Sequence, residues 1–223
     1  NIVHSEGVRA MKVLAISGSP RAGSTTDSLV QEVLKGVECE TEFIGLSGKR
    51  IRPCIACLGC VEDNVCVLDD DMKPMRARIV EADAYVIGAA NYFANINALA
   101  HCFMERWYQF RHQEGDAVKG KPVVLVGAGG GDAQTPVEVL KRFAEYNQLD
   151  LVGSVTAQGP ACCFTCGYGE TCKVGAIHMF FGPGTKITEE ITPSLDKQPD
   201  ARGEARKLGA ELSSRLARFG LGT

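Results

Sequence analysis

The feature that most constrains the fold is an alternation of short apolar runs with segments of helical periodicity. Apolar runs cover residues 12–17, 42–46, 84–89, 122–126 and 151–156, and helical spacing of apolar residues follows each of them. The last such segment carries Ala205, Leu208, Leu212, Leu216 and Phe219 on one face. Apolar strands joined by helices form parallel sheets that are covered on both sides. We therefore predict an α/β chain with a doubly wound, five-stranded parallel sheet in the order 2-1-3-4-5.

A packed run of thiols interrupts this pattern in a loop predicted for residues 52–68. Its cysteines are Cys54, Cys57, Cys60 and Cys66. Structural zinc sites more often pair two short CxxC turns across a long spacer. Three closely spaced cysteines and a fourth nearby are typical of the four thiolates that ligate a [4Fe–4S] cluster. The spacing favours a cluster and a redox role, with zinc as the open alternative.

The loop after the first strand is rich in groups that bind phosphate. Its candidates are Ser17, Ser19, Arg21, Ser24, Thr25 and Thr26, and it leads into a helix. Hydroxyls, a guanidinium and the amides of a helix N-terminus together stabilise a phosphate monoester dianion. The alternative is an ordinary turn rich in capping residues. The loop has neither the Walker spacing nor the dinucleotide fingerprint.

Two further loops at the same edge of the sheet could flank a planar ring. The first contains Ala90, Asn91, Tyr92, Phe93, Asn95 and Ile96, and the second contains Gly127, Gly129, Gly130 and Gly131. Aromatic and backbone groups can flank a ring while amides satisfy its polar edge, and glycines allow the backbone to approach a flat ligand. The alternative places Tyr92 and Phe93 in the core.

A second cysteine-rich segment occupies residues 159–184. Cys163, Cys166 and Cys172 repeat the spacing of Cys57, Cys60 and Cys66, and Cys162 lies alongside. These thiols could ligate another metal or cluster, form a dithiol near a cofactor, or simply pack. Cys39 and Cys102 lie in apolar contexts and are expected to be core thiols. We assign no catalytic residue and no functional histidine, and we expect His101 and His112 to be structural.

Composition excludes several classes of function. The formal net charge is −3, and no basic run exceeds Lys49-Arg50, so we expect no nucleic-acid partner. No apolar stretch is long enough for a bilayer, and residues 1–10 lack the apolar core of a signal peptide. We expect a cytoplasmic protein whose ten cysteines serve metal or redox chemistry. Residues 1–10 are expected to be an extension or tag remnant, and residues 11–223 a single domain.

The motifs GSPRAGSTT, CIACLGC and ANYFANINALAHCFMER lie between Met11 and about Thr156. This stretch resembles iron–sulfur flavoproteins of the NADPH-dependent FMN reductase superfamily. The resemblance implies a flavodoxin-like fold, FMN, a [4Fe–4S] cluster, and a homodimer or homotetramer with cofactors near subunit boundaries. It assigns Ser19, Arg21 and residues 24–26 to the FMN phosphate, and residues 90–96 and 127–131 to the isoalloxazine. Ala90 departs from the proline common in relatives, which implies a less rigid ring loop.

The leading hypothesis is an FMN- and cluster-dependent oxidoreductase that moves electrons between a one-electron, ferredoxin-like protein donor and a small acceptor, such as a quinone or an oxygen species. Lys49, Arg50 and Arg52 would offset the charge of the cluster, or else form a solvated loop. One alternative is an NAD(P)H-dependent FMN or quinone reductase with zinc at the thiols, and another is a non-catalytic electron carrier. The absence of a recognisable nicotinamide motif favours the protein donor.

Overall fold

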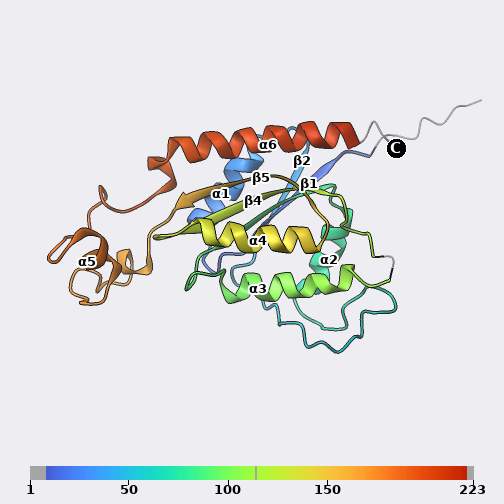
Figure 1. Ribbon diagram of the computed structural model, residues 1–223, viewed down its shortest axis with the longest axis horizontal. Coiled ribbons are helices and arrows are strands. Elements are labelled where there is room, and N and C mark those ends of the chain that lie inside the picture. The colour runs from blue at the N-terminus through green and yellow to red at the C-terminus, as the bar shows by residue number, and fades with distance from the viewer. Residues whose placement is uncertain (1–8, 114, 220–223) are drawn as a thin grey trace, which may run out of the picture.

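A computed structural model describes residues 9–113 and 115–219, except for the side chain of Phe219, so most of the expected N-terminal extension lies outside it. Its centre is a five-stranded sheet in the order β2-β1-β3-β4-β5 (Figure 1). The strands are β1 (Lys12–Ser17), β2 (Glu40–Gly45), β3 (Ala84–Ala90), β4 (Pro122–Gly129) and β5 (Asp150–Gln158), and all pairings are parallel. The predicted flavodoxin-like α/β fold and strand order are confirmed.

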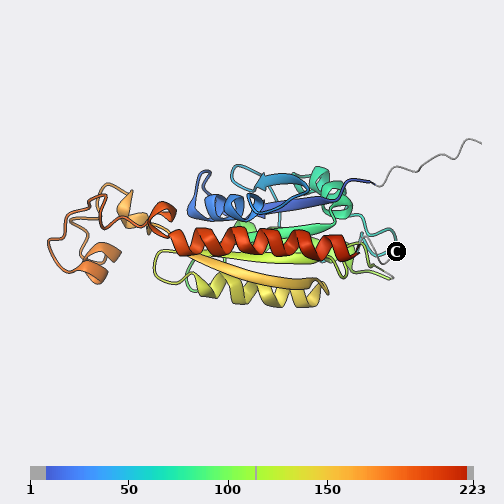
Figure 2. The same ribbon diagram turned by 90° about the horizontal axis from the view of Figure 1, so that it is seen from above.

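Helices cover both faces of this sheet, as the two ribbon views show (Figures 1 and 2). One face packs against α1 (Thr25–Leu34) and α6 (Pro199–Phe219), and the other against α2 (Met72–Glu81), α3 (Ala98–Glu105) and α4 (Gln134–Tyr146). Val13, Val86 and Val124 point to the first face, whereas Leu14 and Ile87 point to the second. The central strands β3 and β4 are apolar throughout because both of their faces are buried.

Several observed element boundaries differ from the expected ones. β2 begins at Glu40 rather than Glu42, because this edge strand starts with polar residues whose carboxylates pair with Lys12. The helical spacing expected after the apolar run 84–89 corresponds to two elements, α3 followed by a 3₁₀ helix, η1 (Arg106–Phe110). β4 continues to Gly129, so Gly127 lies in a strand rather than in the loop after it.

Two excursions leave the sandwich of sheet and helices. The cysteine loop of residues 52–68 lies against η1, below α3 in Figure 1. Residues 159–198 form what we call the lobe, with η2 (Cys162–Phe164), α5 (Ala176–Phe181) and η3 (Leu195–Lys197). The lobe projects beyond the carboxyl ends of the strands (Figures 1 and 2). Across the described ranges, every helix is too short or too polar to cross a membrane.

Candidate functional site

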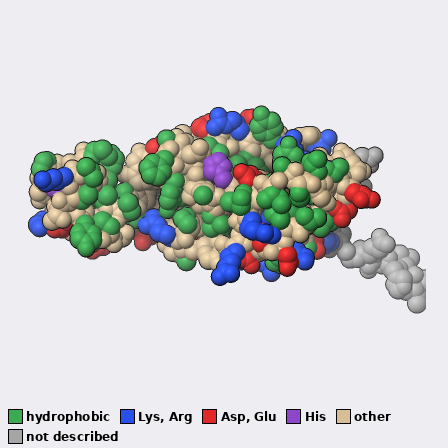
Figure 3. Space-filling view, turned by 90° about the horizontal axis from the view of Figure 1, so that it is seen from below, with side chains coloured by type: hydrophobic (Ala, Val, Ile, Leu, Met, Phe, Trp, Pro, Cys, Tyr) green, Lys and Arg blue, Asp and Glu red, His purple; other side chains and the backbone are tan. Residues whose placement is uncertain are grey.

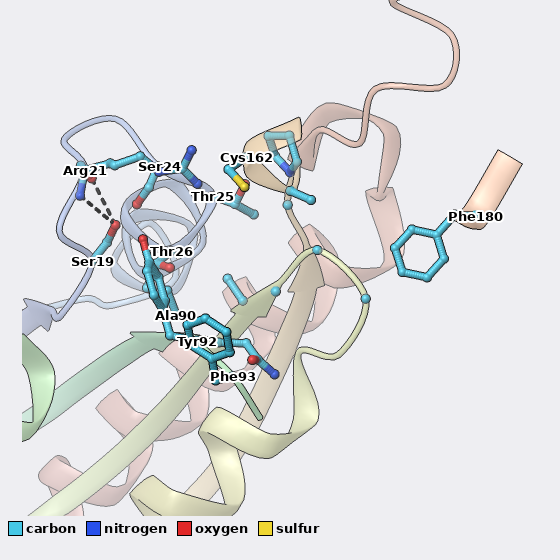
Figure 4. Close-up of a pocket in the computed structure, with 18 residues that line it drawn as sticks. Ser19, Arg21, Ser24, Thr25, Thr26, Ala90, Tyr92, Phe93, Cys162 and Phe180 are labelled. Carbon is cyan, nitrogen blue, oxygen red and sulfur yellow. Dashed lines mark hydrogen bonds between the residues drawn. The ribbon is translucent and has the colours of Figure 1, made fainter. Parts of the chain in front are cut away.

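A cavity of about 450 Å³ opens at the carboxyl ends of β1, β3 and β4, where the lobe begins (Figure 4). Twelve of its lining residues lie at positions predicted from the sequence: Ser19, Arg21, Ser24, Thr25, Thr26, Ala90, Asn91, Tyr92, Phe93, Gly129, Gly130 and Gly131. Three loops that are distant in the sequence therefore meet around one space. This is the edge at which doubly wound sheets bind their ligands.

The loop between β1 and α1 forms the polar end of the cavity. The Ser24 hydroxyl caps α1 by accepting a hydrogen bond from Asp27 N at 3.2 Å, and Gly23 N donates to Asp27 Oδ2 at 2.8 Å. Ser19 Oγ donates to the Arg21 carbonyl at 3.0 Å, which holds the start of the loop. Because α1 begins at Thr25, its first amides have no carbonyl acceptor within the helix. The amides, the helix dipole and the Arg21 guanidinium together favour a phosphate dianion.

The loop between β3 and α3 forms the aromatic end. Tyr92 N donates to Asn95 O at 2.7 Å, and Asn95 N returns a bond to Tyr92 O at 3.0 Å. Phe93 and Ala94 close this turn in the left-handed region, at φ 51° and 53°. The Phe93 side chain is fully exposed and Tyr92 is partly exposed, so neither is folded into the core. Such strained, exposed positions are typical of ligand-binding loops.

The glycines after β4 have a second role that the sequence did not reveal. Gly159 N donates to Gly129 O at 2.9 Å, so the start of the lobe continues beside the end of β4. A Cβ on Gly130 would come within 2.9 Å of the Ala161 Cβ, and one on Gly131 within 3.2 Å of the Phe180 ring. Glycine at these positions therefore lets the lobe pack closely against the loop, and it also leaves the backbone accessible from the cavity.

Four of the predicted residues lie outside the lining of the cavity: Ser17, Asn95, Ile96 and Gly127. Ser17 and Ile96 are buried, and Asn95 Oδ1 accepts from the Ile96 amide at 2.9 Å. Ala128, which lies within the predicted range 127–131, also lines the cavity, and five other lining residues were not predicted: Gly159, Pro160, Ala161, Cys162 and Phe180. The end of a fifth parallel strand could have indicated residues 159–161, whereas no sequence signal points to Phe180.

The cysteine loop is attached to the far end of α3 by its backbone. Cys54 N donates to Glu105 Oε2 at 3.0 Å, and Cys66 N donates to Gln109 Oε1 at 3.1 Å. Burial raises the pKa of the Cys60 thiol, and the neighbouring thiols of Cys66, Cys54 and Cys57 add to the effect. The four predicted ligands thus share one neighbourhood. His112 was expected to be structural, but its Nε2 lies 3.2 Å from Cys60 Sγ.

Arg106 is a buried cation beside these thiols, and the sequence reasoning missed it. Its Nη1 donates to Asp70 Oδ2 at 2.5 Å and to the Arg52 carbonyl at 3.1 Å. Within the described ranges, its Nε and Nη2 are buried without a hydrogen-bond partner. Burial alone would lower the pKa of Arg106, but the hydrogen bond to Asp70 and the neighbouring Cys66 raise it. The predicted cations Arg50 and Arg52 are exposed to solvent, whereas Arg106 is buried.

We tested whether this loop suits a metal group. In residues 9–113 and 115–219, no three Cys, His, Asp or Glu side chains are close enough to hold a single ion. A single zinc ion needs each of its sulfur ligands about 2.3 Å away, and the thiols of this loop are not gathered that closely around one point. A four-iron cluster is a larger body with four thiolate ligands. Ala56 and Leu58 adopt left-handed φ values of 51° and 59° between the cysteines, a strained path that suits wrapping around such a body.

Comparison with known proteins shows the family and the fold of this chain. The model of the NADPH-dependent FMN reductase family matches residues 11–157. An iron–sulfur flavoprotein of Methanocaldococcus jannaschii is 34% identical over 153 residues, or 64% of this chain and 76% of the relative. One of Methanosarcina thermophila is 32% identical over 64% of this chain and 78% of its own. A solved flavone reductase shares the fold, with a TM-score of 0.62 and 15% identity over 96% of this chain and 65% of its own.

These findings define a flavoprotein, a flavin-dependent oxidoreductase built on the flavodoxin-like sheet. The chain belongs to the NADPH-dependent FMN reductase family. The family match ends at residue 157, just before the lobe.

Proposed function

We propose that this protein is an FMN- and [4Fe–4S]-dependent oxidoreductase that moves electrons between a one-electron, ferredoxin-like protein donor and a small acceptor. The observation that carries the proposal is the buried Arg106, which has two unpartnered nitrogens and neighbours Cys66, one of four gathered thiols, in a chain that also has an FMN-sized cavity. Buried N–H groups without acceptors are costly, and thiolates with a bound cluster would supply the acceptors that Nε and Nη2 of Arg106 lack.

In this proposal the cavity holds FMN in a fixed orientation. Bound FMN supplies chemistry that couples one-electron and two-electron partners. Its phosphate is bound by the amides at the start of α1, by the Arg21 guanidinium, and by the hydroxyls of Ser19, Ser24, Thr25 and Thr26. Asn91, Tyr92 and the backbone of residues 129–131 lie at the ring end. Asn91 is held in place because its Nδ2 donates to Asp132 O at 2.8 Å.

Cys54, Cys57, Cys60 and Cys66 ligate the proposed cluster. The Arg106 guanidinium and the His112 ring lie next to Cys66 and Cys60, where they can donate to sulfur. Hydrogen bonds and positive charge at the sulfurs stabilise the more negative, reduced form of a cluster. The chain's own residues thereby raise the reduction potential of the cluster.

The two proposed cofactor sites lie at opposite ends of α3 and η1. Asn97 Nδ2, at the cavity end, donates to Gly18 O at 2.8 Å, whereas Glu105 and His112 contact the cysteine loop. The residues between span roughly 20 Å at the helical rise. Ile55, Leu58 and Val67 expose apolar side chains on the loop, and Figure 3 shows hydrophobic patches on this side of the molecule. We infer a homodimer or homotetramer in which the cysteine loop of one subunit approaches the cavity of another.

The experiment is metal and flavin analysis of protein purified without oxygen. Cys57→Ser is expected to lose about four irons per chain and to keep FMN, because the thiols lie away from the cavity. The matched control is Cys39→Ser, at a half-buried thiol that packs against the opposite core, and it should keep both cofactors. An iron content that Cys57→Ser leaves unchanged would refute the proposed cluster site.

The donor is tested by anaerobic reduction of the bound flavin. Reduced ferredoxin is expected to bleach the flavin absorbance faster than NADPH at equal concentration, and Cys57→Ser should remove that advantage. A wild-type protein that NADPH reduces readily, and ferredoxin does not, would support the NAD(P)H-dependent reductase instead.

A further inference from the structure

The lobe carries a second set of thiols next to the flavin cavity. We propose that Cys162, Cys163, Cys166 and Cys172 ligate a second [4Fe–4S] cluster at the wall of that cavity. The inference deepens the proposed function and rests on it for the role of the FMN site. The ligands belong to residues 159–198, which the family match does not reach.

The first support is spacing. Cys163, Cys166 and Cys172 have the same separations as Cys57, Cys60 and Cys66. A fourth thiol precedes each set, Cys54 in the first and Cys162 in the second. The four thiolates that a cubane cluster requires are therefore present twice in this chain.

The second support is that backbone amides already point at the sulfurs. Ala176 N donates to Cys163 Sγ at 3.2 Å, and Tyr168 N donates to Cys166 Sγ at 3.4 Å. Gly167, between Cys166 and Tyr168, has a left-handed φ of 81° that permits this turn. A Cβ on Gly175 would lie 3.4 Å from Cys172 Sγ, so the Cys163 and Cys172 sulfurs flank the same stretch of chain. Amide hydrogen bonds of this kind stabilise thiolates that bear a cluster.

The third support is that the lobe has almost no core of its own. Among the apolar side chains of residues 159–198, all of which the structure describes, only Ile177 and Leu195 are buried. Its regular structure is limited to η2, α5 and η3. Segments of this size with so little buried apolar surface need a disulfide or a metal group to hold one conformation. All ten cysteines lie in the described residues and none of them forms a disulfide, so the thiols are free to bind a metal group.

The fourth support is position. Cys162 lines the cavity opposite the loop that begins α1, and its sulfur points toward Thr25 in Figure 4. Phe180, on α5 of the same lobe, lines the cavity from another side. A cluster on these thiols would adjoin the flavin cavity of its own subunit. The first cysteine loop, at the far end of η1, does not.

The test compares metal contents of protein purified without oxygen and reconstituted with ferrous iron and sulfide. The wild type is expected to hold about eight irons per FMN, and Cys166→Ser and Cys172→Ser about four each. Cys57→Ser should also fall to about four, and Cys39→Ser should stay at about eight. Should the lobe variants not fold, spin quantitation of the reduced wild type decides, with about two cluster spins per FMN expected.

Three results would overturn this inference. One is a wild type with about four irons, all of them lost in Cys57→Ser. Another is about one zinc per chain that Cys172→Ser removes, because it would make the lobe a zinc site. The third is a disulfide among these cysteines in the reconstituted protein. Failure of the proposed function would appear differently, as an iron content that Cys57→Ser does not lower at all.

Discussion

At the scale of single residues, two arginines carry different parts of the account. Arg21 lies on the surface of the cavity, in the loop that precedes α1. Arg106 is enclosed between Asp70 and the cysteine loop. Arg21 is expected to affect the affinity for the ligand, and Arg106 is expected to affect the balance of buried charge beside the cysteine loop.

Arg21→Ala should weaken FMN binding about tenfold, because a hydrogen bond from a charged group to phosphate contributes about 1.5 kcal/mol. Riboflavin lacks the phosphate, so its affinity should be the same in wild type and variant. Flavin fluorescence titration of the flavin-free protein measures both. An equal loss for the two ligands would show that Arg21 acts elsewhere than at the phosphate.

Asp70→Asn should lower the free energy of unfolding by about 3 kcal/mol at neutral pH, because it leaves a buried guanidinium without its partner. Burial alone would raise the pKa of Asp70, but the hydrogen bond from Arg106 and the amides of Arg52 and Met72 lower it. The stabilisation is therefore complete above the unfolded pKa near 4 and is lost as pH falls through the lower folded value.

Urea unfolding of the cofactor-free protein between about pH 3 and 7 checks this, since the difference between wild type and Asp70→Asn should shrink below about pH 4. Asp69→Asn is the matched control, since Asp69 is exposed and pairs only with Lys73, and it should change stability by less than about 1 kcal/mol. A pH-independent difference at Asp70 would contradict the assigned ion pair.

At the scale of elements, α1 and α6 cross closely over one face of the sheet. A Cβ on Gly209 would overlap the Val33 carbonyl oxygen, and one on Gly36 would overlap the Arg206 carbonyl oxygen. The buried Glu32 accepts from Arg206 Nε at 2.7 Å across the same contact, and from Lys35 Nζ at 2.6 Å at the end of its own helix. The close approach of the two helices therefore depends on glycine.

Gly209→Ala should destabilise the fold by about 2 kcal/mol, because the added methyl group forces α6 away from α1. Gly203→Ala on the same helix meets nothing within 4 Å and should stabilise it by up to about 1 kcal/mol. Thermal unfolding of the two variants should thus shift in opposite directions. A shift in the same direction would contradict the described packing of α6.

Much of this element order was predictable because fully buried strands are apolar over their whole length. The start of β2 was not, because Glu40 and Thr41 are exposed on an edge strand. The change from α3 to η1 was hidden as well, since Phe103, Trp107 and Phe110 are buried and keep an apolar pattern across the boundary. At the site, loop chemistry predicted which residues form the polar end of the cavity. Phe180 could not be predicted, because its place depends on how the lobe folds back.

At the scale of the whole molecule, the cavity lies between the sheet and the lobe, and the first cysteine loop lies at the other end of α3 and η1. The treatment of residues 11–223 as one domain stays a prediction. Under the proposals made above, electrons would reach the flavin from a cysteine loop of another subunit or from the lobe. A monomer with iron only at Cys54, Cys57, Cys60 and Cys66 would therefore transfer electrons to its own flavin poorly.

The claim that this flavoprotein joins FMN to thiolate-bound iron is tested most directly by measuring flavin, iron and zinc in protein purified without oxygen. We predict about one FMN per chain, at least about four irons, and zinc well below one per chain. FMN accompanied by stoichiometric zinc, or by no metal even after reconstitution, would contradict the account.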